Sequence, residues 1–210
     1  MKILLADDHA MFRSGLRRIL EEEFAKVEID ESSSCDETLR KLQKGEWNLL
    51  LLDIAMSDKS SLNVLPDIKA HHPKLPVLIL SMYDDRQFII RALRGGAAGY
   101  LTKENAPSEL ILAIQAVTSG RRYISETMAE QIAEYLAAGD ESQFPHESLS
   151  AREYQVFLMI ASGLSLSDIG TELGLSVKTV STYRTRILEK TGLQSNADII
   201  RYAVRHGLSK

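Results

Sequence analysis

Cysteine is almost absent from the sequence: Cys35 is the only one among 210 residues, so no internal disulfide can form. Long apolar runs are absent too, and none comes near the roughly 18 residues that a membrane-spanning helix needs. The apolar start of the chain meets Asp7 and Asp8 after a few residues, which is not the pattern of a signal peptide. We therefore expect a protein of the reducing cytoplasm that has no membrane partner.

The formal net charge of −4 is distributed unevenly along the chain. Residues 1–147 hold 17 Lys and Arg against 24 Asp and Glu, a balance of −7. Residues 148–210 hold 8 against 5, a balance of +3. An acidic front and a basic rear indicate two domains with different partners. A small basic domain is compatible with DNA binding, although this balance alone is weak evidence for it.

The front half of the chain alternates short apolar segments with amphipathic stretches. The segments expected as buried strands are 2–6, 27–32, 49–53, 77–81 and 99–103, and those expected as helices are 10–22, 35–44, 60–70, 85–94 and 107–118. Five repeats of strand and helix predict an α/β domain with a doubly wound, five-stranded parallel sheet over residues 1–120. In such a sheet, ligands bind beyond the carboxyl ends of the strands.

The rear of the chain has the pattern of a linker and a small all-α domain. Residues 121–147 include a helix at about 125–138 and then a stretch rich in Gly, Pro, Ser and acids, which is typical of a linker. Residues 148–210 predict four helices, and their expected N-cap residues are Ser150, Ser167, Ser176 and Ser195. Ser150 and Glu153 also have the spacing of a capping box. Two of these helices, joined by Gly-Leu-Ser, predict a helix-turn-helix, whose second helix enters the DNA major groove.

Polar groups stand at the carboxyl ends of four expected strands. Asp7 and Asp8 follow the first strand, while Asp53, Ser81 and Lys103 end the third, fourth and fifth. Taken singly, an Asp after a strand is most often a turn former, and the Ser and Lys are most often structural or surface groups. Three converging carboxylates, however, require a cation, and oxygen ligands suit Mg²⁺. An Asp beside Mg²⁺ can accept a phosphoryl group, whose oxygens a Lys and a Ser can bind.

Two motifs carry a resemblance to a known family. The opening DDHAMFRSGL of residues 7–16 is similar to the first-strand signature of response-regulator receiver domains. Residues 149–193 match the LuxR-type helix-turn-helix over nearly their whole length. Practically the full chain resembles the NarL/FixJ family of two-component transcription factors. The resemblance implies a receiver with a flavodoxin-like fold, and a DNA-binding regulator that accepts a phosphoryl group but is not an enzyme.

The resemblance also implies roles for individual residues of the front domain. The implied Mg²⁺ ligands are Asp7, Asp8, Asp53 and the backbone carbonyl of Ala55. The residues implied to handle the phosphoryl group from a partner histidine kinase are Asp53 as acceptor, Lys103 as the holder of the phosphate, and Ser81 and Tyr100 as the switch. Such a pair of switch residues converts a local charge into a change between two conformations.

In the rear domain, the helix expected at 177–192 has a polar stripe that the resemblance assigns to DNA. The residues implied to face bases are Ser181, Thr182 and Thr185, and those implied to lie nearer phosphates are Lys178, Arg186 and Lys190. The residues expected on the inward side are Val177, Val180, Ile187 and Leu188. Without the resemblance, a solvated helix face is an equally good interpretation of the stripe. Family members act as dimers, so we expect a homodimer on double-stranded DNA, with contacts through the helix at 196–206.

The loop after Asp53 departs from the family pattern. Where such receivers carry Pro, Gly and Gly, this chain carries Ser57, Asp58 and Ser61, which predicts an altered loop. An atypical receiver, whose DNA binding is controlled without phosphate, therefore stays open as an alternative. A Mg²⁺-dependent aspartyl-phosphate enzyme is disfavoured, because its second acid would stand where this chain has Ala55. A nucleotide-binding enzyme is disfavoured because no Gly-rich loop follows the first strand.

Overall fold

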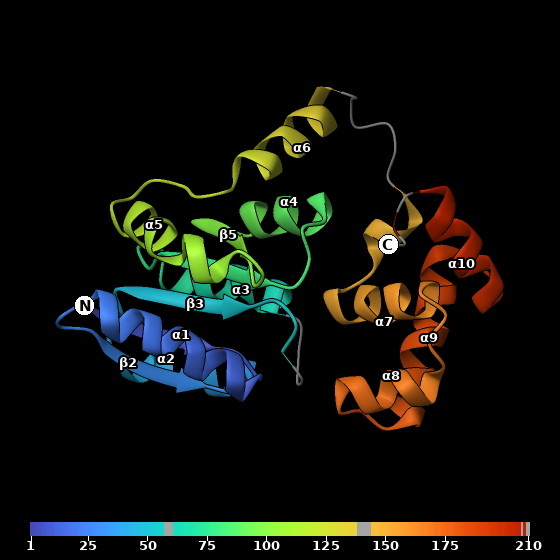
Figure 1. Ribbon diagram of the computed structural model, residues 1–210, viewed down its shortest axis with the longest axis horizontal. Helices are drawn as coiled ribbons and strands as arrows, with labels where there is room; N and C mark the ends of the chain where they lie inside the picture. Colours follow the sequence, from blue (N-terminus) through green and yellow to red (C-terminus); the bar gives the residue numbers. More distant parts are fainter. Residues whose placement is uncertain (57–60, 138–143, 207, 209–210) are drawn as a thin grey trace. The chain divides into compact units, whose positions relative to one another are not determined.

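The computed structural model describes residues 1–56, 61–137, 144–206 and 208. The chain divides into two compact units, Met1–Asp140 and Glu141–Lys210. The first unit is a sheet with helices on both faces, and the second is helical (Figure 1). Within the described parts of the chain, no helix combines the length and the apolar character that crossing a membrane requires.

The first unit is built around five parallel strands. They are β1 (Lys2–Ala6), β2 (Glu28–Ser32), β3 (Leu49–Asp53), β4 (Val77–Ser81) and β5 (Gly99–Thr102), in the order β2-β1-β3-β4-β5. The connecting and following helices are α1 (Ala10–Glu23), α2 (Cys35–Lys44), α3 (Ser61–His71), α4 (Arg86–Arg94) and α5 (Ala106–Thr118). Every neighbouring pair of strands is parallel. The doubly wound five-stranded sheet expected from the sequence is therefore confirmed.

The central strand β3 explains why four consecutive leucines precede Asp53. All five residues of this strand are buried. Helices α1 and α5 cover one face of the sheet, where Leu16 and Leu110 pack in one cluster with Leu49 and Leu51. Helices α2, α3 and α4 contact one another in series and cover the other face (Figure 1). A strand covered on both faces has no solvent side, so its sequence has no polar alternation.

The outer edge of β5 is covered by a second segment of the chain. Tyr123 forms a parallel bridge with Gly99, and its carbonyl accepts the Tyr100 N–H at 2.9 Å. This approach needs a glycine, because a Cβ at position 99 would lie 2.8 Å from the Tyr123 carbonyl oxygen. Pairing of this kind protects an edge strand from association with other chains. Beyond this segment, α6 (Glu126–Ala137) packs on α4, so the helix expected at about 125–138 is present.

The described residues of the second unit, 144–206 and 208, form a short 3₁₀ helix and four α-helices. They are η1 (Pro145–Ser148), α7 (Ala151–Ala161), α8 (Leu166–Leu173), α9 (Val177–Thr191) and α10 (Asn196–Arg205). The side chains that cap the four α-helices are Ser150, Ser165, Ser176 and Ser195. The expectation of Ser167 as the cap of α8 was wrong. Ser165 takes that place because it and Asp168 form a reciprocal capping box, which satisfies two backbone N–H groups at once.

A tight turn that starts at Gly174 joins α8 to α9. The φ angle of Gly174 is 65°, in the left-handed region that residues with a Cβ avoid. The N–H of Leu175 donates to the Gly170 carbonyl at 2.8 Å, which closes the turn against the end of α8. This is the helix-turn-helix connection that the sequence predicted, and α9 is its second helix.

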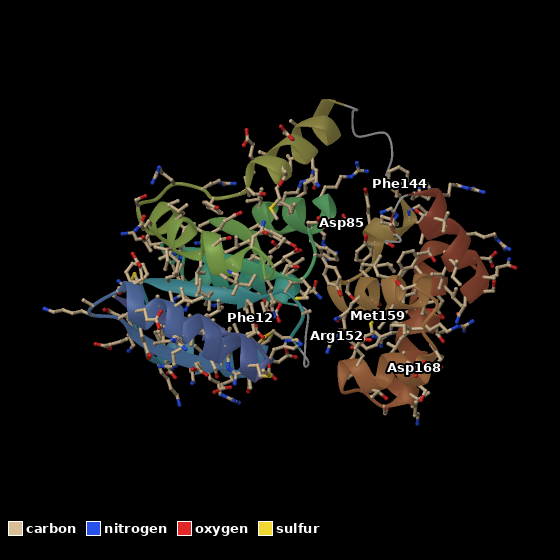
Figure 2. All side chains as sticks on the ribbon, in the orientation of Figure 1. Phe12, Asp85, Phe144, Arg152, Met159 and Asp168 are labelled. Carbon is tan, nitrogen blue, oxygen red and sulfur yellow. The ribbon has the colours of Figure 1, made fainter. Side chains whose placement is uncertain are left out.

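An aromatic cluster joins η1, α7 and α10. The rings of Phe144 and His146 are stacked with their centroids 5.6 Å apart, and the ring centroids of Phe144 and His206 lie 5.0 Å apart in an edge-to-face arrangement. Nδ1 of His146 lies 2.8 Å from the Tyr202 hydroxyl, and the His146 ring also stacks near Tyr154. Figure 2 shows Phe144 beside the end of α10. The segment from 144 onward therefore belongs to the core of the helical unit.

Candidate functional site

Lys103 joins two carboxylates at the carboxyl edge of the sheet. Its Nζ lies 2.6 Å from Oδ2 of Asp7 and 2.8 Å from Oδ2 of Asp53, and all three side chains are buried. The Lys103 backbone N–H donates to the Ser81 carbonyl at 2.7 Å, which fixes this residue to the end of β4. The ammonium also lies 4.8 Å from the ring centroid of Phe12 on α1. Groups that are far apart in the sequence thus meet at one point.

Burial dominates the electrostatics of Asp53. Removal from water raises the pKa of its carboxyl to about 6, a rise that Lys103 opposes and Asp7 increases. Burial also disfavours the charge of Lys103, but the two carboxylates outweigh it and hold the pKa of Lys103 above its ordinary value. The Ala55 N–H donates to Oδ1 of Asp53 at 3.2 Å and orients the carboxylate. A poorly hydrated carboxylate in a fixed orientation is suited to nucleophilic attack.

Four side chains meet where a metal ion was expected. A carboxylate oxygen from each of Asp7, Asp8 and Asp53 and a ring nitrogen of His9 lie within 4.8 Å of one another. Oδ2 of Asp7 and Oδ1 of Asp8 are buried and accept no hydrogen bond from the residues that the structure describes; each has only an ion-pair neighbour. Crowded carboxylate oxygens of this kind are stabilised by a cation, and such a donor set fits Mg²⁺.

His9 is the member of this cluster that sequence reasoning missed. Its Nδ1 lies 2.8 Å from Oδ1 of Asp8, 3.2 Å from Oδ1 of Asp7 and 3.8 Å from Oδ2 of Asp53. Its backbone N–H donates to Oδ1 of Asp7 at 2.7 Å. With its side chain 58% exposed, His9 lies at the mouth of the pocket. The sequence contained a signal for this position, because His9 directly follows Asp7 and Asp8 in the same turn.

Ser81 and Tyr100 are connected through the loop after β4. The Ser81 hydroxyl oxygen accepts the backbone N–H of Tyr83 at 3.0 Å. The Tyr100 hydroxyl donates to the carbonyl of the same Tyr83 at 2.7 Å. Tyr100 is fully buried, and this burial raises the pKa of its hydroxyl far above the ordinary value. The two residues assigned to the switch therefore bind the N–H and the carbonyl of the same residue, Tyr83.

The divergent loop is described only at its end. Ser57 and Asp58 lie outside the described residues, whereas Ser61 begins α3 and is buried. Its N–H donates to the Ile54 carbonyl at 3.1 Å. No described residue other than glycine has a positive φ, so the backbone at Ser61 does not require the glycine that the family pattern has there.

The polar stripe expected on α9 is exposed. Its members are Lys178, Ser181, Thr182, Thr185 and Glu189, and Arg186 beside Thr182 is exposed as well. On the opposite side, Val180 and Ile187 are fully buried, and Leu188 is half-buried. Val177 was expected to face inward, which is wrong: its exposed fraction is 49%. The reason is that Val177 begins the helix and lies one turn before Ser181, at the margin of the exposed stripe.

Lys190, a further cation near the end of α9, has an ion-pair partner among the described residues. Its Nζ lies 2.6 Å from Oε2 of Glu153, and the same oxygen accepts the Ser150 N–H at 2.7 Å. On the neighbouring side of α9, Nε of Arg184 donates to Oδ1 of Asn196 at 2.6 Å. The contact of Lys190 with a phosphate thus stays a prediction, and it competes with an ion pair inside the unit.

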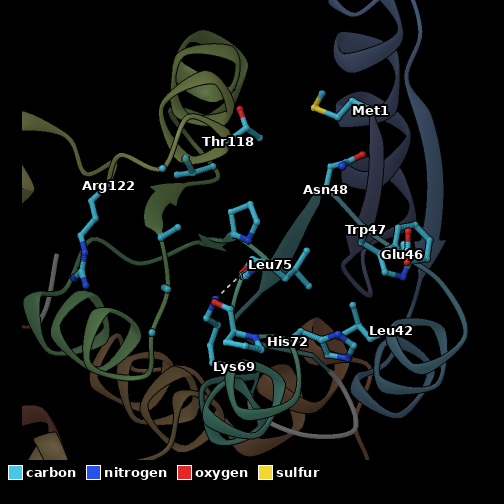
Figure 3. A pocket seen from close by; sticks show the side chains of 18 of the residues that line it. Met1, Leu42, Glu46, Trp47, Asn48, Lys69, His72, Leu75, Thr118 and Arg122 are labelled. Carbon is cyan, nitrogen blue, oxygen red and sulfur yellow. Dashed lines mark hydrogen bonds between the residues drawn. The ribbon is translucent and has the colours of Figure 1, made fainter.

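A concavity lies at the amino-terminal edge of the sheet, opposite the edge that carries Asp53 (Figure 3). The Lys69 ammonium in it donates to the carbonyls of Pro73 and Leu75, at 2.9 and 2.6 Å. The Trp47 indole N–H donates to the Lys41 carbonyl at 3.1 Å. Both polar groups hold the backbone in place near the ends of helices α3 and α2. Their role is therefore structural, and we assign the concavity no ligand.

Comparison with known proteins agrees with this architecture. Residues 3–115 match the response regulator receiver domain, and residues 147–203 match the bacterial regulatory proteins of the luxR family. The response regulator UvrY of Escherichia coli K12 is 33% identical over 208 residues, which cover 99% of this chain and 95% of UvrY. The response regulator GacA of Pseudomonas syringae pv. syringae is 34% identical over 208 residues, which cover 99% of this chain and 97% of GacA.

A solved structure matches this chain over both of its domains. RcsB from Salmonella enterica serovar Typhimurium, bound to promoter P1flhDC in the presence of phosphomimetic BeF₃⁻, has a TM-score of 0.60 and 25% identity; the match covers 96% of this chain and 97% of that one. A receiver fold joined to a LuxR-type helix-turn-helix defines a DNA-binding response regulator of a two-component system. The chain belongs to the NarL/FixJ family of these transcription regulators.

Proposed function

We propose that this response regulator is switched by transfer of a phosphoryl group from a partner histidine kinase to Asp53. The observation that carries the proposal is the contact of one buried ammonium, Lys103, with both Asp53 and Asp7. An ammonium in this position can bind a phosphoryl oxygen as soon as the Asp53 carboxylate carries the group. The poorly hydrated carboxylate is the acceptor, and its environment favours a neutral or a metal-paired form over a free charge.

The chain's own residues account for each part of the transfer. An Asp53 oxygen attacks phosphorus, the bond from phosphorus to the donor imidazole nitrogen breaks, and the nitrogen keeps the electron pair. Lys103 then pairs with an oxygen of the transferred group. Mg²⁺, held by Asp7, Asp8, Asp53 and the Ala55 carbonyl, would neutralise the charge of the carboxylates and the phosphoryl oxygens. Ser81 would turn its hydroxyl to another phosphoryl oxygen and thereby release the N–H of Tyr83.

We further propose that α9 is the DNA-reading helix. Its exposed stripe combines two cations with three hydroxyl side chains, which suits phosphates and base edges respectively. Exposed apolar side chains on α10, Ile200 and Val204, supply a contact for a second copy of the chain. Dimers of RcsB are described on DNA, and a homodimer of this chain would likewise present two reading helices to paired half-sites.

Intact mass measurement tests the phosphoryl transfer. The full chain is incubated with Mg²⁺ and acetyl phosphate, and its mass is compared with those of Asp53→Asn and Asp67→Asn. We expect one added phosphoryl group on the wild type and on Asp67→Asn, whose substitution lies at an exposed position of α3, and none on Asp53→Asn. An unmodified wild type would refute the proposal and favour a receiver that is controlled without phosphate.

Selection of DNA from a random pool, with and without acetyl phosphate, tests the DNA-binding part. We expect one enriched sequence with two-fold symmetry, and tighter binding after phosphorylation. An enzyme with a helical appendage would enrich no sequence. Enrichment that is indifferent to phosphate, in a protein that takes up the phosphoryl group, would refute the coupling of the two domains and leave DNA binding intact.

A further inference from the structure

The hydroxyl groups on the exposed face of α9 are partly used within the helix. The Thr182 hydroxyl donates to the Lys178 carbonyl at 3.0 Å, and the Thr185 hydroxyl donates to the Ser181 carbonyl at 3.1 Å. A threonine has one hydroxyl proton, so each of these side chains keeps acceptor capacity but has no donor left for a base. Each of the two threonines therefore presents a methyl group and an acceptor oxygen outward.

Val177 extends this methyl-bearing face to the start of the helix. Its side chain is 49% exposed, and it is surrounded by the exposed polar residues Ser176, Lys178 and Ser181. Among the described residues of the helical unit, the other large apolar side chains with comparable exposure are Ile200 and Val204, and both lie on α10. A single exposed Val is ordinary on a protein surface. Its position in the first turn of the reading helix is what gives it a candidate role.

The first turn of the second helix is the part of a helix-turn-helix that contacts base edges. In the major groove, the thymine C5-methyl is the one apolar group that a base presents, and small apolar side chains and threonine methyls recognise it. Guanine, by contrast, is read by bidentate donors such as Arg or Lys. An exposed Val and two threonines without a free proton offer no such donors.

We propose that α9 reads thymine through methyl contacts, with Val177 as a specificity-determining residue and the methyl groups of Thr182 and Thr185 as its partners. This inference rests on the proposed role of α9 as the DNA-reading helix. Eight residues separate Val177 from Thr185, a helical rise of about 12 Å, or about four base-pair steps of 3.4 Å. The preferred half-site therefore contains methyl-read thymines within a window of about four base pairs.

Replacement of thymine by uracil removes only the methyl group and keeps the pairing, so it isolates this contact. The site selected by the phosphorylated full-length protein is rebuilt with uracil at one thymine of a half-site at a time. We expect wild-type affinity to fall about fourfold at each methyl-read position, the value of one buried methyl group. In Val177→Ser, which leaves no methyl group at this position, the uracil and thymine versions of one position are expected to bind equally, while the other positions keep their preference.

Two substitutions at Thr185 form a matched pair. Thr185→Val keeps a methyl and loses the hydroxyl, and Thr185→Ser keeps the hydroxyl and loses the methyl. The inference expects the preference for thymine over uracil at one position to survive in the first variant and to disappear in the second. Thermal unfolding of each variant confirms that the helical unit is intact before binding is measured.

The outcomes separate this inference from the function on which it rests. If the wild type enriches no sequence, the DNA-reading role of α9 fails. If it enriches a sequence but uracil costs less than about 1.5-fold at every thymine, far below the fourfold expected for a methyl group, methyl readout is overturned. If the preference for thymine survives in Val177→Ser at every position, the assignment of Val177 is overturned. A guanine-rich site relaxed by Lys178→Ala would instead assign the reading to that cation.

Discussion

Nζ of Lys190 lies 2.6 Å from Oε2 of Glu153, a residue 37 positions earlier in the chain. The Glu153 carboxylate is also the acceptor of the capping box at the start of α7, so one oxygen ties the end of α9 to the beginning of α7. Burial pushes the pKa of Glu153 up, but the Lys190 ammonium and the Ser150 N–H outweigh it and hold that pKa below its ordinary value. The pair therefore stabilises the packing of α9 against α7.

Lys190→Met removes the ammonium and keeps most of the alkyl chain. We expect the free energy of unfolding of the helical unit to fall by about 1–2 kcal/mol. This value lies between the usual contribution of an exposed ion pair and the cost of breaking a buried one. Because the folded-state pKa of Glu153 is lowered, the pair's contribution is present above pH 4.5 and is lost as the pH falls through the lowered value. Thermal unfolding from pH 3 to 7 checks this, and an equal loss at all pH values would contradict it.

The double variant Lys178→Ala/Arg186→Ala removes two exposed cations from α9. We expect weaker binding to all DNA sequences and a smaller slope of log affinity against log salt, by about 0.9 for each phosphate contact that is lost. Lys190→Met is the matched control, because it removes a cation of the same helix that is engaged inside the protein. Gel-shift titrations at several salt concentrations measure the slopes. A control slope reduced by about 0.9, the value of one phosphate contact, would place Lys190 on a phosphate as well.

Asp53→Asn is expected to stabilise the metal-free first unit at neutral pH. The pKa of Asp53 is raised from 3.8 to about 6, so the folded state binds its proton more tightly than the unfolded state does. Wild-type stability therefore falls as the pH rises from 3.8 to about 6, by up to about 3 kcal/mol. Unfolding followed by the fluorescence of Trp47, the single tryptophan, measures the difference.

The advantage of Asp53→Asn should shrink below pH 5, where the wild-type carboxyl is protonated. Excess Mg²⁺ should also reduce it, since binding to the folded state alone stabilises the wild type. Asp67→Asn, at an exposed position, should unfold like the wild type under all these conditions. A wild type that is more stable than Asp53→Asn at pH 7.5 without Mg²⁺ would contradict the role of burial.

Tyr100→Phe removes the hydroxyl that donates to the Tyr83 carbonyl at 2.7 Å. The expected cost is about 1 kcal/mol of stability of the first unit, the usual net value of one hydrogen bond. Ser81 binds the N–H of the same Tyr83. The variant should therefore take up the phosphoryl group normally, but phosphorylation should raise its DNA affinity less than it raises that of the wild type. The measurement is the ratio of DNA affinities with and without acetyl phosphate. An unchanged ratio would remove Tyr100 from the switch.

The sequence by itself determined the elements and the ends of the strands. Four leucines before Asp53 predict a strand covered on both faces, and parallel strands share one carboxyl edge, so Asp7, Asp53 and Lys103 are expected at the same edge of the sheet. The ends of the helices in the second unit were also predictable from neighbouring residues in the sequence. The serine caps accept backbone N–H groups at the helix starts, and Gly174 adopts the left-handed backbone that ends α8. The cap of α8 was misjudged by two residues because Ser165 and Ser167 carry the same local signal.

Only the tertiary structure decided what each side chain has as its neighbours. The pairing of Lys190 with Glu153, the raised pKa of Asp53 and the exposure of Val177 all depend on distances between elements far apart in the chain. Burial and electrostatic energy are sums over such neighbours, and no local pattern contains them. The order of residues therefore defined a receiver and a helix-turn-helix, whereas packing decided which of their charges and methyl groups are free to meet a partner.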